Sequence, residues 1–184
     1  MKKNLFSTKT IVATGLGAAL FMVLFMFVKV PSPVPETNLQ IAYGISAFFA
    51  AVFGPVAGFL IAFIGHALSD FISYGSPWWS WVVASGVSGL IAGFAYFKID
   101  VENGKLSTKD LVTFNLFAII GCAIAWIVIA PLLDVVIYGE PMNLVITQGL
   151  VAFVMDAIVS CVVGTVLLIA YSKTKTSQGS LTKE

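Results

Sequence analysis

The residues best suited to chemistry gather in one stretch of an otherwise apolar chain, Ala62–Trp81. This stretch holds the only histidine of the sequence, His66, and an aspartate four residues later, Asp70. Residues spaced i and i+4 on a helix share a face, with about 5–6 Å between their Cβ atoms. The pair is therefore suited to holding a polar ligand, with Asp70 orienting the imidazole, or to acting as an acid and a base. The alternative is a structural pair that neighbouring helices satisfy.

Three tryptophans follow within four residues, at positions 78, 79 and 81. Tryptophan is enriched at membrane interfaces without any further role, because its amphipathic ring prefers that depth. Successive residues of a helix point about 100° apart, however, so the three indoles cannot all face the same way. We expect at least one, Trp78 or Trp79, to turn inward, where it could stack on a planar ligand.

A further acid, Asp156, stands alone within the apolar run LVAFVMDAIVSCVVG. Ionisable groups inside a membrane are costly, and they are usually paired or exposed to a polar cavity. Candidate partners on the same half of the bundle are Gln148, Tyr43, Gln40 and His66. The sequence leaves open whether Asp156 belongs to a cavity or makes only an interhelical hydrogen bond.

The composition places these residues in a membrane protein. The chain is 59% hydrophobic and 10% charged, with a mean hydropathy of +0.99, whereas soluble domains carry about 25% charged residues. It contains no arginine, which argues against a nucleic-acid partner and against a bidentate clamp for phosphate. With 184 residues it fits one domain.

Six apolar segments are expected to cross the membrane as helices, which predicts an all-α bundle. They cover residues 10–29, 38–53, 55–73, 78–97, 111–133 and 145–171. The second is expected to begin at an N-cap within Glu36–Asn38, and residues 134–143 are expected to connect the fifth segment to the sixth. Residues 1–172 would form the membrane domain, and residues 173–184 a polar cytoplasmic tail.

Lysine placement predicts the orientation, since cytoplasmic loops carry the excess of positive charge. With six spans, the N-terminus, the 98–110 connector and the C-terminal tail share one side and hold nine of the ten lysines. Both termini are thus predicted to be cytoplasmic. The stretch with His66 and the tryptophans then lies toward the outer side, as part of a multi-pass protein of a prokaryotic plasma membrane.

Motifs for several kinds of chemistry are missing from the sequence. It contains no GxxxxGK[ST], GxSxG, HExxH or CxxC pattern, which argues against ATP binding, hydrolase, metalloprotease and thiol-redox chemistry. One histidine without a nearby cysteine also argues against a metal site, which would need three or four ligands. We expect no cofactor, no metal and no enzymatic activity of the chain itself.

Small residues four apart recur in the first predicted helix, as Ala13 with Gly17 and Gly15 with Ala19. Such pairs let helices approach closely. Because they lie in the cytoplasmic half, they could receive a partner protein, whereas similar pairs in the third and fourth helices are expected to serve internal packing.

The chain resembles the S components of energy-coupling-factor (ECF) vitamin transporters. The resemblance rests on the six short spans, on the small pairs of the first helix and on two segments, TNLQIAYGISAFFAAVFGPVAGFLIAFIGHALSD and PWWSWVVASG. The resemblance covers roughly residues 8–171. Within the family, the two segments look like a prokaryotic branch labelled hydroxymethylpyrimidine or pyridoxine-type permeases. The resemblance implies a subunit that captures a vitamin near the outer leaflet beneath a lid, here residues 31–38. It also implies docking on a transmembrane T component driven by two cytoplasmic ABC-type ATPases, which would hydrolyse the ATP.

The family's docking motif is an alanine-x-x-x-alanine pair in the first helix. This chain departs from it with its two mixed glycine and alanine pairs. The residues predicted to bind the solute are His66, Asp70, Tyr43, Gln40, Asn38, Tyr74, Trp78, Trp79, Gln148 and Asp156. Two other functions remain open: a standalone proton-coupled carrier with Asp156 as the proton site, and a membrane enzyme that uses His66 and Asp70.

Overall fold

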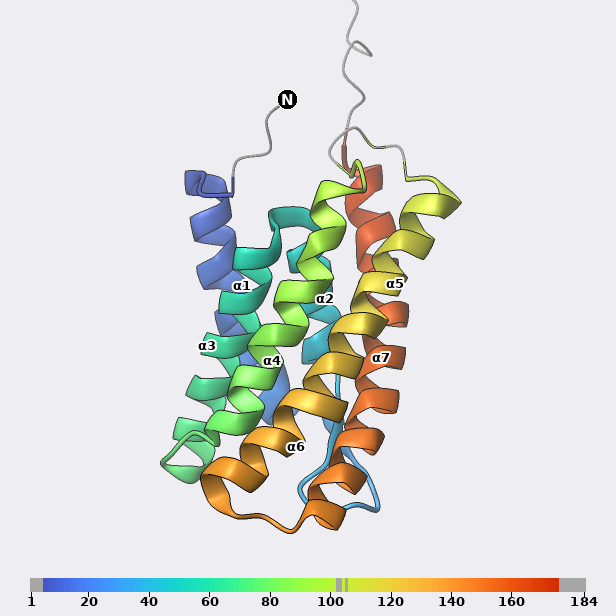
Figure 1. Ribbon diagram of the computed structural model, residues 1–184. Coiled ribbons are helices and arrows are strands. Elements are labelled where there is room, and N and C mark those ends of the chain that lie inside the picture. Colours follow the sequence, from blue (N-terminus) through green and yellow to red (C-terminus); the bar gives the residue numbers. More distant parts are fainter. Residues whose placement is uncertain (1–4, 102–103, 105, 176–184) are drawn as a thin grey trace, which may run out of the picture.

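The computed structural model describes residues 5–101, 104 and 106–175, and these residues are mostly helical (Figure 1). Within them, five helical segments are long and apolar enough to cross a membrane, and one apolar helix is shorter. The segments are α1 (Thr8–Phe27), the short α2 (Ala42–Phe53), α3 (Pro55–Tyr74), α4 (Trp79–Ala92) continued by the 3₁₀ turn η1 (Gly93–Phe97), a long rod from Thr108 to Tyr138, and α7 (Met142–Lys173). The predicted six-helix membrane bundle is confirmed.

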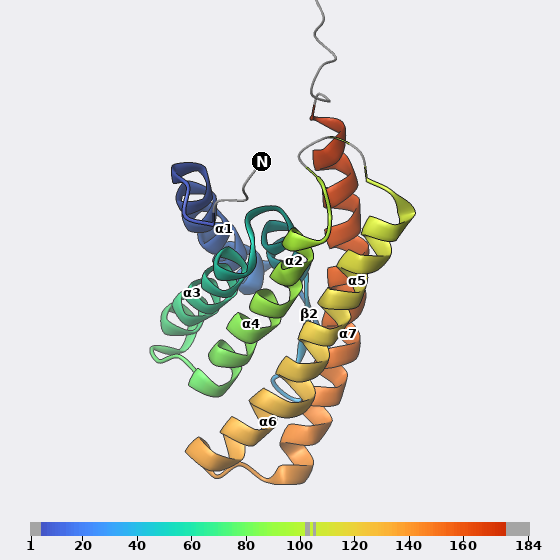
Figure 2. The same cartoon turned by 45° about the horizontal axis from the view of Figure 1, so that its top comes forward.

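The segments pack side by side in a ring, in the order α1, α3, α4, the long rod and α7, with α2 closing it between α7 and α1. Figures 1 and 2 show that α1 begins and α7 ends at the same end of the bundle. The lysine distribution predicts this end to be cytoplasmic. Residues 176–184, most of the predicted tail, lie outside the described part of the chain.

Helices α3 and α4 approach each other through two glycines, Gly58 and Gly89. A Cβ atom on either residue would collide with the backbone carbonyl of the other. Only glycine permits this contact, which is how small residues bring helices together inside membranes. The prediction that the small residues of these two helices serve internal packing is confirmed.

The connection between α1 and α2 is a short hairpin, in which β1 (Lys29–Pro31) pairs with β2 (Asn38–Gln40) in antiparallel register. The predicted N-cap at Glu36–Asn38 is therefore wrong, and α2 begins only at Ala42. Pro31, next to the turn, fixes its own backbone and donates no hydrogen bond, so extended structure is favoured there. The pairing opposite Lys29–Pro31 then holds Asn38–Gln40 in a strand.

The rod from Thr108 to Tyr138 combines α5 (Thr108–Ala123), the π-helical turn η2 (Ile124–Ile129), α6 (Ala130–Leu133) and a second π-helical turn, η3 (Asp134–Tyr138). Pro131 has no N–H to donate to the carbonyl four residues earlier, which favours the wider turn that precedes it. The predicted connection over residues 134–143 is wrong at its start, because the helical rod continues to Tyr138. Asp134 is consequently buried in the bundle, at 2% exposure.

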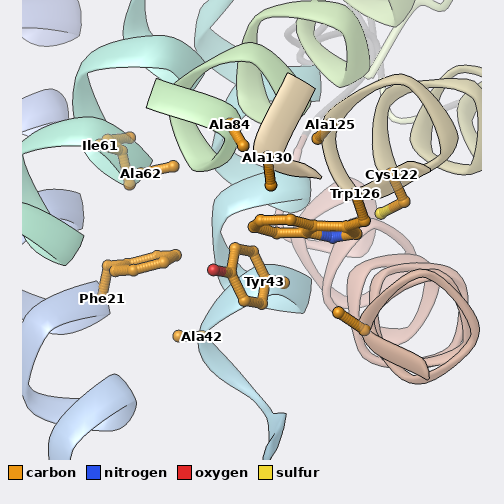
Figure 3. Close-up of a cluster of buried hydrophobic side chains, with 11 residues drawn as sticks. Phe21, Ala42, Tyr43, Ile61, Ala62, Ala84, Cys122, Ala125, Trp126 and Ala130 are labelled. Atoms are coloured by element: carbon orange, nitrogen blue, oxygen red, sulfur yellow. The ribbon is translucent and has the colours of Figure 1, made fainter. Parts of the chain in front are cut away.

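The core near the middle of the bundle is built from aromatic and small side chains (Figure 3). Tyr43 of α2 meets Phe21 of α1 and Trp126 of η2 edge to face, each with 5.3 Å between ring centroids. Edge-to-face rings are a favourable arrangement of aromatic quadrupoles. These contacts join three segments and form the floor of the cavity described next.

Candidate solute-binding site

A cavity of about 560 Å³ lies at the end of the bundle opposite to the start of α1. Its volume falls in the range of small-molecule sites, about 300–1,000 Å³. The end of α1, the β1–β2 hairpin, the end of α3, the start of α4, the rod and the start of α7 all contribute to it. Lysine placement predicts that this end faces outward, so the cavity would be reached from outside the cell.

His66 and Asp70 lie in the wall of this cavity and are the start of a buried polar chain. The His66 Nε2 atom lies 3.4 Å from Asp70 Oδ1, and its Nδ1 atom lies 2.7 Å from the Ser85 hydroxyl of α4. That hydroxyl is in turn 2.9 Å from the Tyr43 hydroxyl of α2. With a neutral imidazole, Tyr43 donates to Ser85, Ser85 donates to Nδ1, and the Nε2 proton points to Asp70.

These hydrogen bonds give His66 and Asp70 a structural role in addition to their place in the cavity wall. The second oxygen of Asp70 accepts a hydrogen bond from the Trp78 backbone N–H at 3.0 Å, which fixes the start of α4. The polar atoms of both side chains are thus engaged by protein groups. The two residues connect three helices around the cavity and also line it. The connection agrees with the alternative raised from the sequence, a structural pair that neighbouring helices satisfy.

Asp134 organises the tryptophans at the start of α4. Its Oδ1 atom accepts from Trp78 Nε1 at 2.7 Å and from the Ser80 hydroxyl, and its Oδ2 atom accepts from Trp81 Nε1 at 2.7 Å. Hydrogen bonds to a charged acceptor are the strong ones in proteins. The carboxylate therefore holds two indoles in fixed orientations beside the cavity, which both of them line.

The three neighbouring tryptophans take different places. Trp81 stacks on Trp126 with 5.4 Å between centroids and 25° between planes, and Trp78 stacks on Tyr138 at 4.5 Å. Trp79 is 46% exposed, its ring lies 6.2 Å from Phe63, and it is not among the described lining residues. Of the two tryptophans singled out in the sequence, Trp78 is the one at the cavity.

Some buried polar atoms of the cavity lining have no protein partner. Nε1 of Trp126, Oδ1 of Asp156 and Oε1 of Gln40 are buried and have no hydrogen-bond partner among the described residues. All three residues line the cavity. Sequence reasoning missed Trp126, although a signal was present: it is the one tryptophan in the middle of an apolar segment, away from the cluster at the helix end.

The remaining predicted site residues lie at the mouth of the cavity. Asn38 in β2, Tyr74 at the end of α3 and Gln148 on α7 all line it. The Gln148 side-chain amide donates to the Pro35 carbonyl at 3.1 Å, which ties the hairpin to α7. Pro35 lies within residues 31–38, the segment that the resemblance predicts to act as a lid.

The charges around the cavity are mainly acidic. Five carboxylates are among the described lining residues, those of Glu36, Asp70, Asp134, Glu140 and Asp156. Lys29 is the single lysine in the same set. Such a lining favours a neutral or cationic solute over an anionic one.

The four small residues of α1 divide between two faces. Gly17 is buried, and a Cβ atom there would lie 2.7 Å from the Ile61 side chain of α3. Gly15 is exposed, with nothing within 4 Å of the same test position, and Ala19 is exposed beside it. Ala13 is half-buried. Gly15 and Ala19 are therefore the pair that this helix presents outward, whereas Gly17 serves packing inside the bundle.

The six-helix membrane bundle with a polar, aromatic cavity at one end defines a membrane-embedded solute-binding protein. A family model described as "ECF-type riboflavin transporter, S component" matches residues 5–173. The chain belongs to this family of ECF S components.

Curated relatives match over nearly the whole chain. A protein of Streptococcus gordonii named "UPF0397 protein" is 50% identical over 179 residues, covering 97% of this chain and 96% of the relative. A Clostridium perfringens protein of the same name is 49% identical over 184 residues, covering 100% of both chains. These names assign no substrate.

Solved structures share the fold. One described as the S component of a bacterial ECF transporter is 27% identical with a TM-score of 0.56, covering 88% of this chain and 92% of that chain. FolT bound with folic acid is 15% identical with a TM-score of 0.61, covering 88% of this chain and 98% of that chain. ECF S components are substrate-binding subunits of vitamin transporters and not enzymes, and they work with a T component and ATPases. The chain is accordingly a multi-pass plasma-membrane protein.

Proposed function

We propose that this chain captures a small, water-soluble vitamin or vitamin precursor on the outer side of the membrane. It would then dock on a transmembrane T component with two cytoplasmic ATPases, which drive release of the solute to the inside. The observation that carries this proposal is the cavity at the predicted outer end, where aromatic rings surround buried polar atoms without protein partners. Pockets of this kind fix a ligand by a few polar groups within apolar walls.

A planar heterocycle suits the walls of this cavity. Trp81 and Trp126 present stacked rings, and Tyr43 stands edge-on to Trp126. A hydroxymethylpyrimidine or pyridoxine-like compound is the first choice, and riboflavin, named in the description of the family model, is the natural competitor. A phosphorylated compound is disfavoured, because the chain has no arginine to bind phosphate in bidentate fashion.

Docking is assigned to the outward face of α1. Gly15 and Ala19 are exposed on that helix, so the backbone of a partner helix could approach closely there. Gly17 is expected to contribute indirectly, since it seats α1 against α3. Ala13, half-buried beside it, would lie at the border of the docking face.

The proposal is tested by purifying the chain from its native host in mild detergent. Mass spectrometry would then identify the proteins and the small molecules that are retained. We expect a T component, two ATPases and a heterocyclic solute. Recovery of the chain with a bound solute but with neither kind of partner, after crosslinking in the membrane, would contradict the ECF assembly.

A further inference from the structure

We propose that the lining of the cavity selects solutes with an amidine-like edge, in which an N–H donor stands beside a nitrogen acceptor, as in a 4-aminopyrimidine. This inference rests on the proposed function, since it names the class of solute that the same cavity takes. The residues that carry it are Asp156, Trp126 and Gln40.

Unpartnered polar atoms are concentrated in the lining of this cavity. Four buried side-chain polar atoms have no hydrogen-bond partner among the described residues, and three of them belong to residues that line the cavity. Asp156 is 2% exposed, Trp126 is 1% exposed and Gln40 is 7% exposed. Buried polar groups in proteins are nearly always hydrogen-bonded. Their clustering at one cavity points to a ligand that supplies the partners.

The types of these atoms specify the ligand. The Asp156 and Gln40 oxygens accept hydrogen bonds, so the solute must present N–H or O–H groups to them. The Trp126 indole only donates, so the solute must also present a lone pair. A planar ring with both kinds of group matches the types of these atoms, and the rings of Trp81 and Trp126, which stack on each other in the wall of the cavity, provide flat apolar surface for it.

The charges of the cavity lining restrict the class of solute further. The carboxylates of Asp70 and Asp134 are already engaged by donors of the protein, whereas the Asp156 Oδ1 atom is not. A solute with a basic ring nitrogen could become protonated against Asp156, which would add a charge-assisted bond. A solute carrying a carboxylate or phosphate at this edge would instead bring a second acidic group against Asp156, and neither Trp126 nor Gln40 offers a cationic partner.

The test compares matched solutes on the purified full-length protein. The probes are 4-amino-5-hydroxymethyl-2-methylpyrimidine and the same ring with a 4-oxo group, and binding is measured by isothermal titration calorimetry. The amino compound is expected to bind at least about tenfold more tightly, since leaving one buried acceptor unpaired costs about one factor of ten or more. Equal or tighter binding of the oxo compound would overturn the inference, as would absence of binding by both.

Variants then locate the selecting group. Asp156→Asn replaces one acceptor by a donor, so the preference for the amino compound is expected to fall at least about tenfold. Trp126→Phe keeps a ring but removes the donor, and should weaken the amino compound while leaving its preference over the oxo compound. Asp110→Asn makes the same exchange at the capping box of α5, at the other end of the bundle. It should change neither the affinity for the amino compound nor the preference over the oxo compound.

The solute retained by the native protein provides an independent check. A retained compound without an N–H donor, or one with a carboxylate or phosphate on its heterocycle, would overturn the inference and leave the proposed function intact. Tight binding of the amino compound without any ATP-dependent uptake in the complete complex would overturn the proposed function and leave the inference about the solute intact. The two proposals therefore fail separately.

Discussion

Replacing Asp134 by leucine is expected to destabilise the protein strongly, because this carboxylate is the acceptor for three side chains of α4. It holds the indoles of Trp78 and Trp81 at 2.7 Å each and also accepts from the Ser80 hydroxyl. Leucine keeps the branching of the aspartate side chain at Cγ, with two methyl groups in place of the two oxygens, and it offers no acceptor. The substitution therefore removes all the hydrogen bonds of the carboxylate at once, and the bulkier methyl groups can only add to the loss of stability.

The magnitude follows from the exposure of the three donors. Ser80 is fully buried and Trp81 is partly buried, whereas Trp78 is 42% exposed and can turn to water. A buried donor left without a partner costs about 1–3 kcal/mol. Two such donors predict a loss of about 2–6 kcal/mol in the free energy of unfolding.

The assay is unfolding of the purified protein in detergent, followed by tryptophan fluorescence. Emission should shift in the folded variant, because two of the four indoles lose their charged acceptor. Glu140→Leu removes a nearby carboxylate at the cavity and should leave both readouts close to those of the native chain. Stability within about 0.5 kcal/mol of the native value for Asp134→Leu, with unchanged emission, would refute the role assigned to Asp134.

Three further predictions concern packing, docking and the lid. Gly89→Ala should lower the unfolding midpoint, since its Cβ would collide with the Gly58 carbonyl. Gly15→Ala enters open space within α1 and should not lower the midpoint, because alanine favours the helix. Equal midpoints of the two variants would contradict the close approach of α3 and α4. Gly15→Leu should abolish uptake by cells that express the complete complex while calorimetry shows unchanged solute binding, and a parallel loss of binding would speak against a docking role. Gln148→Leu removes the hydrogen bond to the Pro35 carbonyl, a bond of about 1 kcal/mol. In stopped-flow measurements it should speed solute release about fivefold, and an unchanged rate would show that this bond does not restrain the hairpin.

Hydropathy was sufficient to predict the membrane bundle, because each span needs only a long enough apolar run, and lysine placement predicts which end is cytoplasmic. Finer boundaries depended on tertiary pairing that these signals do not contain. Asn38–Gln40 would serve as a helix start on local grounds, yet pairing with Lys29–Pro31 makes it a strand. Asp134 resembles the first residue of a loop, but the helical rod continues past it and α4 supplies its donors.

The candidate site was predictable in outline, because polar residues are scarce within the apolar segments of this chain. His66, Asp70, Tyr43 and Gln40 do line the cavity, as does Asp156. Which polar atoms remain available was not predictable, since this depends on contacts between helices distant in sequence. The pairing of His66 with Ser85 is one such contact.

Trp126 escaped prediction for a different reason. It lies in the π-helical turn η2, where the wider turn changes which residues face the interior. A regular helical projection through this segment would therefore misplace its inward face. Its position at mid-segment was the signal that a buried indole needs a partner or a ligand.

The central claim, capture of a solute for an ATP-driven partner complex, is tested most directly by uptake in proteoliposomes. The labelled solute retained on purification would be offered to vesicles that contain this chain alone, or this chain with the T component and ATPases and with ATP inside the compartment that the ATPases face. We predict accumulation only with the complete complex and ATP, and none with this chain alone under an imposed proton gradient. Accumulation by the chain alone, driven by that gradient and lost in Asp156→Asn, would contradict the account and establish a proton-coupled carrier instead.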